Sequence, residues 1–512
     1  MEIRREQMIL DNESLRYSTP EEQGISSESL LDFFETVRNN NKDNAVDLHS
    51  FQVIRHDHII AEGAGKPFSL NNFHRIYSSA KGIIALGVML AVQEGKVDIN
   101  EKVADIFSDN LPDNLSEKIK KVTVYHLLTM SCGQDVDSCV DMFKSDNWIK
   151  TFLSIDPVYE PGSRFFYNNG IPHVLAAIVE KKTGEDIISY MEPRLLAPIG
   201  AKVLCRYNKQ KEREPSTVCV RQTDLTKFGY LLLKRGKWNG KQLISPEICD
   251  EYGKFHISTA SHPKIFRNFG YGYQVWKMPC EGFILAGGND NHSCVFTEAD
   301  MVFSCMANNK IKGDFSIQKT FYDLVYLKMS GRPLPPNPQA YERLQNCLTQ
   351  WNLAPHGSDE SGLEERIAGK TFTFEANSFG CESVCFLVDK AKQELEICTT
   401  EHGAVHRLRC GMAGTWPVTK DYIVIPPNLT HGNFIDGEEP SENMASGAWT
   451  DRNRLLVYGR SLGRVASDQF DFRFDKNRLH LYIKTPALAV PGCAVDKKKG
   501  EFYLTAVLDE QC

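Results

Sequence analysis

The sequence has little of what marks a nucleic-acid-binding, disordered or fibrous chain. Among its 512 residues, 59 Lys and Arg stand against 66 Asp and Glu, and the resulting net charge of −7 is mild. It supplies neither a basic surface for nucleic acid nor a polyacidic tail. Hydrophobic residues make up 42% and charged residues 24% of the chain, an ordinary globular composition that excludes disordered and collagen-like classes. At about 100–200 residues per domain, this length favours two or three domains, each with its own core.

Long apolar runs are missing as well. The N-terminal segment 1–12 carries charges and has no apolar run of the length that a signal peptide needs. The richest apolar stretch, 82–92, is too short to cross a bilayer. The 15 cysteines form no CxxC pair, so we expect free thiols in a reducing compartment. These absences favour a soluble cytoplasmic protein with no membrane partner and no nucleic-acid partner, and they leave its oligomeric state open.

The chain also lacks the motifs that hold metals and nucleotide cofactors. It contains no HExxH, no P-loop and no GxGxxG after a strand. Its 14 histidines show no ligand spacing. We therefore expect no metal and no cofactor.

Prolines concentrate in the segment 331–339, which holds four of them in nine residues. Such a stretch is typical of a domain exit. A short amphipathic piece and then a polar stretch follow it. We predict a first domain over 1–332, a linker over 333–364 and a second domain over 365–512.

Beyond residue 365 the pattern changes to short alternating runs. Phe470, Phe472 and Phe474 place three aromatics on one face with charges on the other, the period-two mark of a half-buried strand. Similar runs occur at 371–374, 384–388, 394–397, 422–425, 455–458, 479–483 and 502–507. About eight strands in roughly 145 residues predict a small antiparallel β-barrel.

The most informative segment of the chain is Ile76-Tyr-Ser-Ser-Ala-Lys81, followed by an apolar stretch typical of a buried helix. Ser78 and Lys81 are three residues apart, a spacing that stacks two side chains on one helix face, about 5–6 Å apart. A hydroxyl and an amine in that arrangement can exchange a proton, and the helix N-terminus favours an oxyanion at Ser78. The alternative is that Ser78 merely caps the helix.

A second segment, 160–170, carries Tyr167 and Asn169 just after a Pro-Gly turn. A tyrosine can relay a proton to a leaving group, and an asparagine can orient a substrate amide or the lysine. The alternative is an aromatic loop anchor beside a turn asparagine.

A third segment is the apolar strand 283–286, which ends in Gly287 and Gly288. Glycines in a strand let another backbone approach closely. An extended acyl substrate along this edge needs such access, with one backbone N–H completing an oxyanion hole. The alternative is a bulge or a hairpin turn.

Together and in this order, the three segments resemble the serine hydrolases of the β-lactamase-related, penicillin-recognising family. That family includes class C β-lactamases, D-aminopeptidases, DD-peptidases, related esterases and 6-aminohexanoate hydrolases. The stretches 18–25, 122–129 and 268–272 are similar to phrases that the family repeats, and the resemblance covers about residues 17–330. It implies an α/β fold of the β-lactamase/transpeptidase type, with an antiparallel sheet flanked by helices and an inserted helical lobe.

The resemblance also implies roles for individual residues. Ser78 would be the acylated nucleophile and Lys81 its activating base. Tyr167 would shuttle a proton, with Asn169 as its polar partner. The backbone N–H groups of Ser78 and Asn289 would form the oxyanion hole.

The third motif of the family, usually Lys-Thr-Gly or His-x-Gly, falls on Ala286, Gly287 and Gly288. Ala286 departs from the pattern, because β-lactamases and carboxypeptidases use the polar or cationic residue at this place near a substrate carboxylate. We therefore expect an uncharged or differently anchored acyl substrate rather than strong β-lactamase activity. Further on, His292 stands where relatives carry a glycine-rich loop, and it either points into the pocket to assist protonation or is merely solvated.

The run 446–456 resembles a phrase found in the lipocalin-like β-barrel that some family members carry after the hydrolase domain. The whole chain is thus predicted to be a serine hydrolase or acyltransferase that forms an acyl-enzyme on a small ester, amide or peptide. Two alternatives stay open. One is a penicillin-binding-type thioesterase or peptide cyclase, and the other is a catalytically weak binding or sensing module of the same fold.

Overall fold

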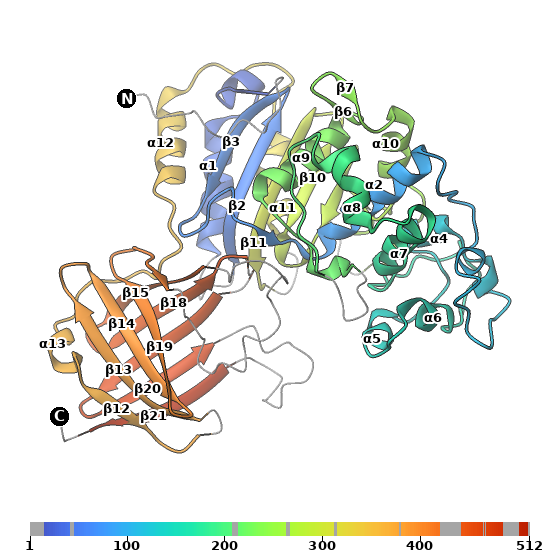
Figure 1. Cartoon of the computed structure of the whole chain (residues 1–512). Coiled ribbons are helices and arrows are strands. Elements are labelled where there is room, and N and C mark those ends of the chain that lie inside the picture. Colours follow the sequence, from blue (N-terminus) through green and yellow to red (C-terminus); the bar gives the residue numbers. More distant parts are fainter. Residues whose placement is uncertain are drawn as a thin grey trace. The chain divides into compact units, whose positions relative to one another are not determined.

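The computed structural model describes residues 15–40, 46–206, 213–262, 267–311, 315–377, 380–419, 442–463, 465, 467–484 and 501–509 (Figure 1). The chain divides into two compact units. The first comprises Met1–Gly63 and Arg75–Thr349, and the second comprises Ala64–His74 and Gln350–Cys512. The association of 64–74 with the second unit has no signal in the sequence pattern, and the domain bounds drawn from the proline-rich segment stay a prediction.

A seven-stranded sheet forms the centre of the first unit. Its order is β1 (Arg16–Tyr17), β3 (His58–Ala64), β2 (Val46–Arg55), β11 (Met301–Asn309), β10 (His292–Phe296), β9 (Gly282–Ala286) and β8 (Trp276–Lys277). β1 pairs with β3 in parallel, whereas the pairings from β2 through β11, β10 and β9 to β8 are antiparallel. The pairing of β2 with β11 joins segments from the two ends of this unit's sequence, so the centre of the sheet depends on a long-range contact.

Helices cover both faces of this sheet. Its central strand β2 is buried at every position, and side chains alternate between the two faces of a strand. The Phe51 ring packs against Phe33 of α1 (Ser27–Asn39), with centroids 6.3 Å apart. On the opposite face, the Ser50 hydroxyl donates to the side chain of Gln222, the first residue of α9 (Gln222–Leu233), at 2.9 Å.

The segment between β3 and β8 supplies further helices of this unit, including a helical lobe. α2 (Ala80–Gln93) is buried along nearly its whole length and packs against α7 and α8. The other described α-helices of this segment are α3 (Val103–Ile106), α4 (Val124–Leu128), α5 (Cys139–Met142), α6 (Trp148–Leu153), α7 (Ile171–Thr183), α8 (Ile187–Met191) and α10 (Pro246–Gly253). Two more, α11 (Ile317–Leu324) and α12 (Pro338–Thr349), follow β11. No helix within the described ranges is both long and apolar enough to cross a membrane.

The second unit is built around a closed β-barrel. Among the described residues, nine strands form the ring: β12 (Thr371–Phe374), β13 (Cys381–Asp389), β14 (Glu394–Glu401), β15 (Ala404–Gly411), β17 (Asn443–Asp451), β18 (Arg454–Ser461), β19 (Ser467–Asp475), β20 (Arg478–Lys484) and β21 (Glu501–Leu508). β15 and β17 close it through a short parallel pairing, while the other neighbours pair antiparallel. A short strand, β16 (Val418–Thr419), forms an additional antiparallel pairing with β17.

The predicted architecture, an antiparallel sheet flanked by helices with a helical lobe and then a small β-barrel, is therefore confirmed. Two details of the described residues differ from the expectation: each unit contains a parallel pairing between strands, and the barrel has nine strands rather than about eight. The expected strand at 422–425 lies outside the described residues. The likeness of the barrel to lipocalins stays a prediction.

Aromatic side chains fill the barrel interior. The Phe386 ring, fully buried on β13, lies 5.3 Å from the ring of Phe472 and 5.5 Å from that of Phe474. Phe470 is also buried, as the alternation along this strand predicts. Because each ring excludes water from its neighbours, this cluster supplies a large share of the apolar area that the barrel buries.

We expect Phe386→Ala to lower the free energy of unfolding of the barrel by about 3–5 kcal/mol, through lost burial and the cavity left behind. The next residue, Leu387, is 40% exposed and gives a matched control. Leu387→Ala should cost about 0.5 kcal/mol or less, as surface changes do. Denaturant titration, monitored by hydrogen exchange of the barrel strands, measures the free energy of unfolding of both variants. Equal losses in the two variants would contradict the proposed core.

Candidate active site

Ser78 sits in a short 3₁₀ turn, η3 (Tyr77–Ser79), that leads directly into α2. Tyr77 has a φ of +48°, a left-handed conformation that residues other than glycine rarely adopt. The turn is anchored by the buried hydroxyl of Ser79, which lies 3.0 Å from the carbonyl oxygen of Leu285 and 2.5 Å from that of Asn291. Ser78 is thus held on a sharp turn beside the end of β9.

Lys81 lies one helical turn further on and is only 7% exposed. Its Nζ is 3.0 Å from Ser78 Oγ and 2.9 Å from Asn169 Oδ1. The side-chain contact expected from the three-residue spacing is therefore present. A buried amine needs such partners, because burial of an unpaired polar group costs free energy. The lysine joins two of the segments singled out in the sequence.

Asn169 is oriented by a carboxylate that the sequence pattern did not single out. Asp137 accepts hydrogen bonds from the backbone N–H of Asn169 at 2.8 Å and from its Nδ2 at 2.6 Å. Because Asp137 binds the amide nitrogen, the amide oxygen Oδ1 points to Lys81. Asp137 precedes α5 in the helical lobe, so the lobe sets the geometry around the lysine.

Tyr167 lies on the other side of the lysine. Lys81 Nζ is 4.9 Å from the centre of the Tyr167 ring, and this ring stacks on Trp276 with centroids 5.6 Å apart and planes 23° from parallel. Within the part of the chain that the structure describes, the Tyr167 hydroxyl has no hydrogen-bond partner. It is therefore available to a substrate, while Trp276 of β8 fixes the ring.

Gly287 allows the end of β9 to approach the serine turn. A Cβ at this position would lie 2.1 Å from the carbonyl oxygen of Ile76, so only glycine fits without a backbone shift. Gly288 lies beside the Tyr77 ring, where a Cβ would be at contact distance. Among the described residues, neither the Ser78 N–H nor the Asn289 N–H donates a hydrogen bond. Two unpaired donors beside the serine are what an oxyanion hole requires.

Ala286 and His292 pair directly across β9 and β10. The backbone N–H of Gly287 donates to His292 Nδ1 at 3.2 Å, which leaves the proton on Nε2, 3.1 Å from Asp290 Oδ1. Burial lowers the pKa of His292 below its usual range, although Asp290 opposes this. Both ring nitrogens are thus engaged inside the protein, bracing the loop after β9. The substrate role expected for His292 stays a prediction that would require the ring to leave these bonds.

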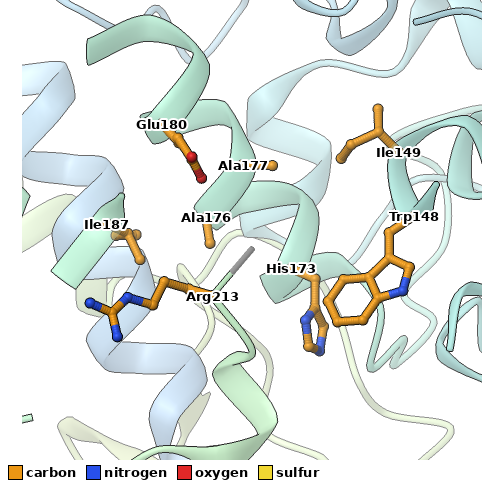
Figure 2. Close-up of a pocket in the computed structure, with 8 residues that line it drawn as sticks. All are labelled: Trp148, Ile149, His173, Ala176, Ala177, Glu180, Ile187 and Arg213. Atoms are coloured by element: carbon orange, nitrogen blue, oxygen red, sulfur yellow. The ribbon is translucent and has the colours of Figure 1, made fainter. Parts of the chain in front are cut away.

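A small cavity lies elsewhere in the helical lobe, between α6, α7 and α8 (Figure 2). Its volume is about 10 Å³, and it is lined by Trp148, Ile149, His173, Ala176, Ala177, Glu180, Ile187 and Arg213. A space of this size holds about one water molecule. None of the residues expected at the active site lines it.

His173, shown beside Trp148 in Figure 2, is buried between aromatic rings at the edge of this cavity. Its ring centroid is 4.9 Å from that of Trp148 and 5.3 Å from that of Phe143. Nδ1 is buried without a hydrogen-bond partner among the described residues. Burial, with the nearby Lys81, lowers the pKa of His173 to about 3.

Comparison with known proteins shows which protein family this chain matches. The family model described as Beta-lactamase matches residues 36–326, which is more than half of the chain. Esterase EstB of Burkholderia gladioli is 25% identical over 175 residues, covering 29% of this chain and 44% of that protein. A D-aminopeptidase of Brucella anthropi is 26% identical over 140 residues, covering 27% of this chain and 26% of that protein. The matched region thus spans less than half the length of each curated relative.

Among solved structures, the octameric penicillin-binding protein homologue from Pyrococcus abyssi is similar over 88% of this chain and 98% of its own, with a TM-score of 0.44 and 16% identity.

The buried His173 predicts a pH dependence of stability. Between its ordinary pKa of 6.5 and about 3, the unfolded chain binds a proton at this ring that the folded protein does not bind. Stability should therefore fall as the pH falls through this window, by up to about 1.4 kcal/mol per pH unit from this one group. Urea titrations between pH 7 and 4 measure the slope.

His173→Gln should make that slope shallower, whereas the same change at His480, exposed on β20, controls for composition. An unchanged slope in His173→Gln would show that other groups carry the acid sensitivity.

Proposed function

This chain belongs to the beta-lactamase family, as its resemblance to that family predicted, and we propose that it is a serine hydrolase that forms an acyl-enzyme on Ser78. The observation that carries the proposal is the position of Lys81 Nζ, within hydrogen-bond distance of both Ser78 Oγ and Asn169 Oδ1. A nucleophile bonded to a base that a third group orients is the arrangement that nucleophilic catalysis needs.

In the acylation step, Lys81 takes the proton of the Ser78 hydroxyl while Oγ attacks the carbonyl carbon of the substrate. The negative charge that develops on the carbonyl oxygen is stabilised by the unpaired N–H groups of Ser78 and Asn289. The bond to the leaving group then breaks, and Tyr167 gives that group a proton, which Lys81 replaces. The free hydroxyl of Tyr167 and the short distance from its ring to Lys81 support this relay.

In the deacylation step, a water molecule loses a proton to the neutral amine of Lys81, directly or through the Tyr167 hydroxyl, and attacks the acyl carbon. The bond to Ser78 Oγ then breaks, Lys81 returns the proton to this oxygen, and the acid leaves. An alcohol or amine in place of water gives acyl transfer instead. The names of the curated relatives, an esterase and a D-aminopeptidase, support a small ester, amide or peptide as the substrate.

We expect Ser78→Ala to abolish acylation and to reduce turnover of p-nitrophenyl esters by at least about 10³-fold, the scale of loss when a nucleophile is removed. Intact-protein mass spectrometry after brief exposure to p-nitrophenyl acetate, a D-amino-acid amide and a penicillin measures the adduct. Ser163, whose exposed hydroxyl bonds the carbonyl oxygen of Glu160, gives the control Ser163→Ala.

Full turnover in Ser78→Ala would refute the proposal. A stable Ser78 adduct that is never hydrolysed would instead assign the chain to the binding or sensing alternative.

Asp137→Asn should slow acylation by about 100-fold, because a small misplacement of a positioned group costs on this scale. The new amide accepts fewer hydrogen bonds than the carboxylate, so Asn169 is free to turn its nitrogen toward Lys81. Asp135, two residues away and exposed, gives the matched control Asp135→Asn, which should be unchanged. Single-turnover kinetics with an activated ester distinguish the two, and equal rates would show that Asp137 has no positioning role.

A further inference from the structure

Arg267 is a half-buried cation near the proposed active site, without an ion-pair partner among the described residues. Its guanidinium carbon lies 5.0 Å from the centre of the Trp276 ring. Within the described ranges, it forms no ion pair and no hydrogen bond. Burial lowers the pKa of Arg267 below its usual range, and an arginine side chain keeps its charge even so. A desolvated charge without a partner costs free energy, unless a bound ligand supplies the opposite charge.

Among the described residues, Asp290 is the carboxylate whose charge acts on this cation, but both of its oxygens already accept hydrogen bonds elsewhere. One accepts from His292 Nε2, and the other accepts from the Asn309 side chain at 2.8 Å and the Ile317 backbone N–H at 2.7 Å. Asp290 therefore braces its own loop, and it forms no ion pair with Arg267 in the described structure.

A second unpaired group lies on the same aromatic wall. The hydroxyl of Tyr271 is fully buried and has no hydrogen-bond partner among the described residues. Its ring centroid lies 4.9 Å from that of Trp276, and its phenol lies within electrostatic range of Arg267 and Tyr167. Buried hydroxyls are nearly always hydrogen-bonded, so an orphaned one marks a place that a ligand or water completes.

The wall connects these two groups to the proposed chemistry. Trp276 contacts Arg267 and Tyr271 and also stacks on Tyr167, whose ring is the neighbour of Lys81 Nζ. A substrate acylating Ser78 and lying along Tyr167 would therefore reach the guanidinium with a spacer of several atoms.

We propose that Arg267, assisted by the Tyr271 hydroxyl, binds a carboxylate group of the substrate. This inference rests on the proposed hydrolase function and names its substrate class: esters or amides that carry a free carboxylate several atoms from the scissile carbonyl. The guanidinium fork matches a carboxylate in shape and charge, and a partly dry site strengthens the bond. Ala286 offers no cation, so Arg267 supplies the one that the site otherwise lacks.

The test compares p-nitrophenyl monoesters of glutaric, adipic and suberic acids with the same compounds methylated on the free carboxylate. Each pair has the same length and leaving group and differs only in charge. We expect wild type to prefer at least one free acid over its methyl ester by roughly tenfold or more in kcat/KM. Arg267→Gln should remove this preference, chiefly through KM, and leave the methyl esters within about twofold.

Two further variants separate charge from structure. Tyr271→Phe removes only an unpaired hydroxyl, so it should keep the melting temperature and lose a severalfold part of the preference. Arg164, exposed and packed on the Tyr159 ring at 4.6 Å, gives the matched control Arg164→Gln, which should keep the full preference.

A preference for the free acid that persists in Arg267→Gln, or its absence in wild type, would overturn the inference. Ser78-dependent turnover of the methyl esters would in that case leave the hydrolase proposal intact. If neither ester is turned over, the mass-spectrometric test of Ser78 decides the hydrolase proposal, and calorimetric titration of Ser78→Ala with adipate decides the subsite separately. Adipate binding that Arg267→Gln abolishes supports it, and absence of binding overturns it.

Discussion

The burial of the Lys81 amine is the constraint on which the rest of the site depends. It stands near the start of an otherwise apolar helix and is 7% exposed, so its nitrogen must find oxygen partners inside the protein. One partner, Ser78, comes from the same helix start, and the other, Asn169, comes from a loop that the helical lobe positions through Asp137. The sheet, α2 and the lobe therefore have to fold in one relative arrangement for the lysine to be satisfied.

The parts of the site that could be predicted from sequence are those set by local geometry. Ser78 and Lys81 are neighbours because of helix periodicity, and Gly287 signals a close backbone approach by its residue type alone. Asp137 and Trp276 could not be found in this way, because an aspartate before a short helix and a tryptophan in a two-residue strand have no distinguishing pattern. Their roles arise from contacts between segments that are distant in the sequence.

The same distinction holds for the fold. Alternation at 470–474 identifies the inward face of a strand, since burial on one side is a property of that strand alone. The parallel closure between β15 and β17 has no local signature, because it depends on how many strands precede it in the ring. His292 shows how a local pattern can also mislead. In a polar stretch of sequence it resembles a surface residue, yet strand pairing opposite Cys305 and Ala286 buries it, and two hydrogen bonds keep it there.

The burial of His292 also explains why the cation of the site is Arg267 and does not stand at position 286. Ala286 pairs directly with His292, and side chains opposite each other in such a pair have Cβ atoms about 4.5–5.5 Å apart. A lysine at 286 would place a positive charge against the buried, neutral imidazole of His292 and would compete for the Asp290 carboxylate that this ring binds. Arg267 avoids this conflict because it rests on the Trp276 ring, whose face attracts a cation without neutralising it. A substrate anion would then be bound beside Trp276, which pairs with Ile284 two residues before Ala286, rather than at the end of β9 itself.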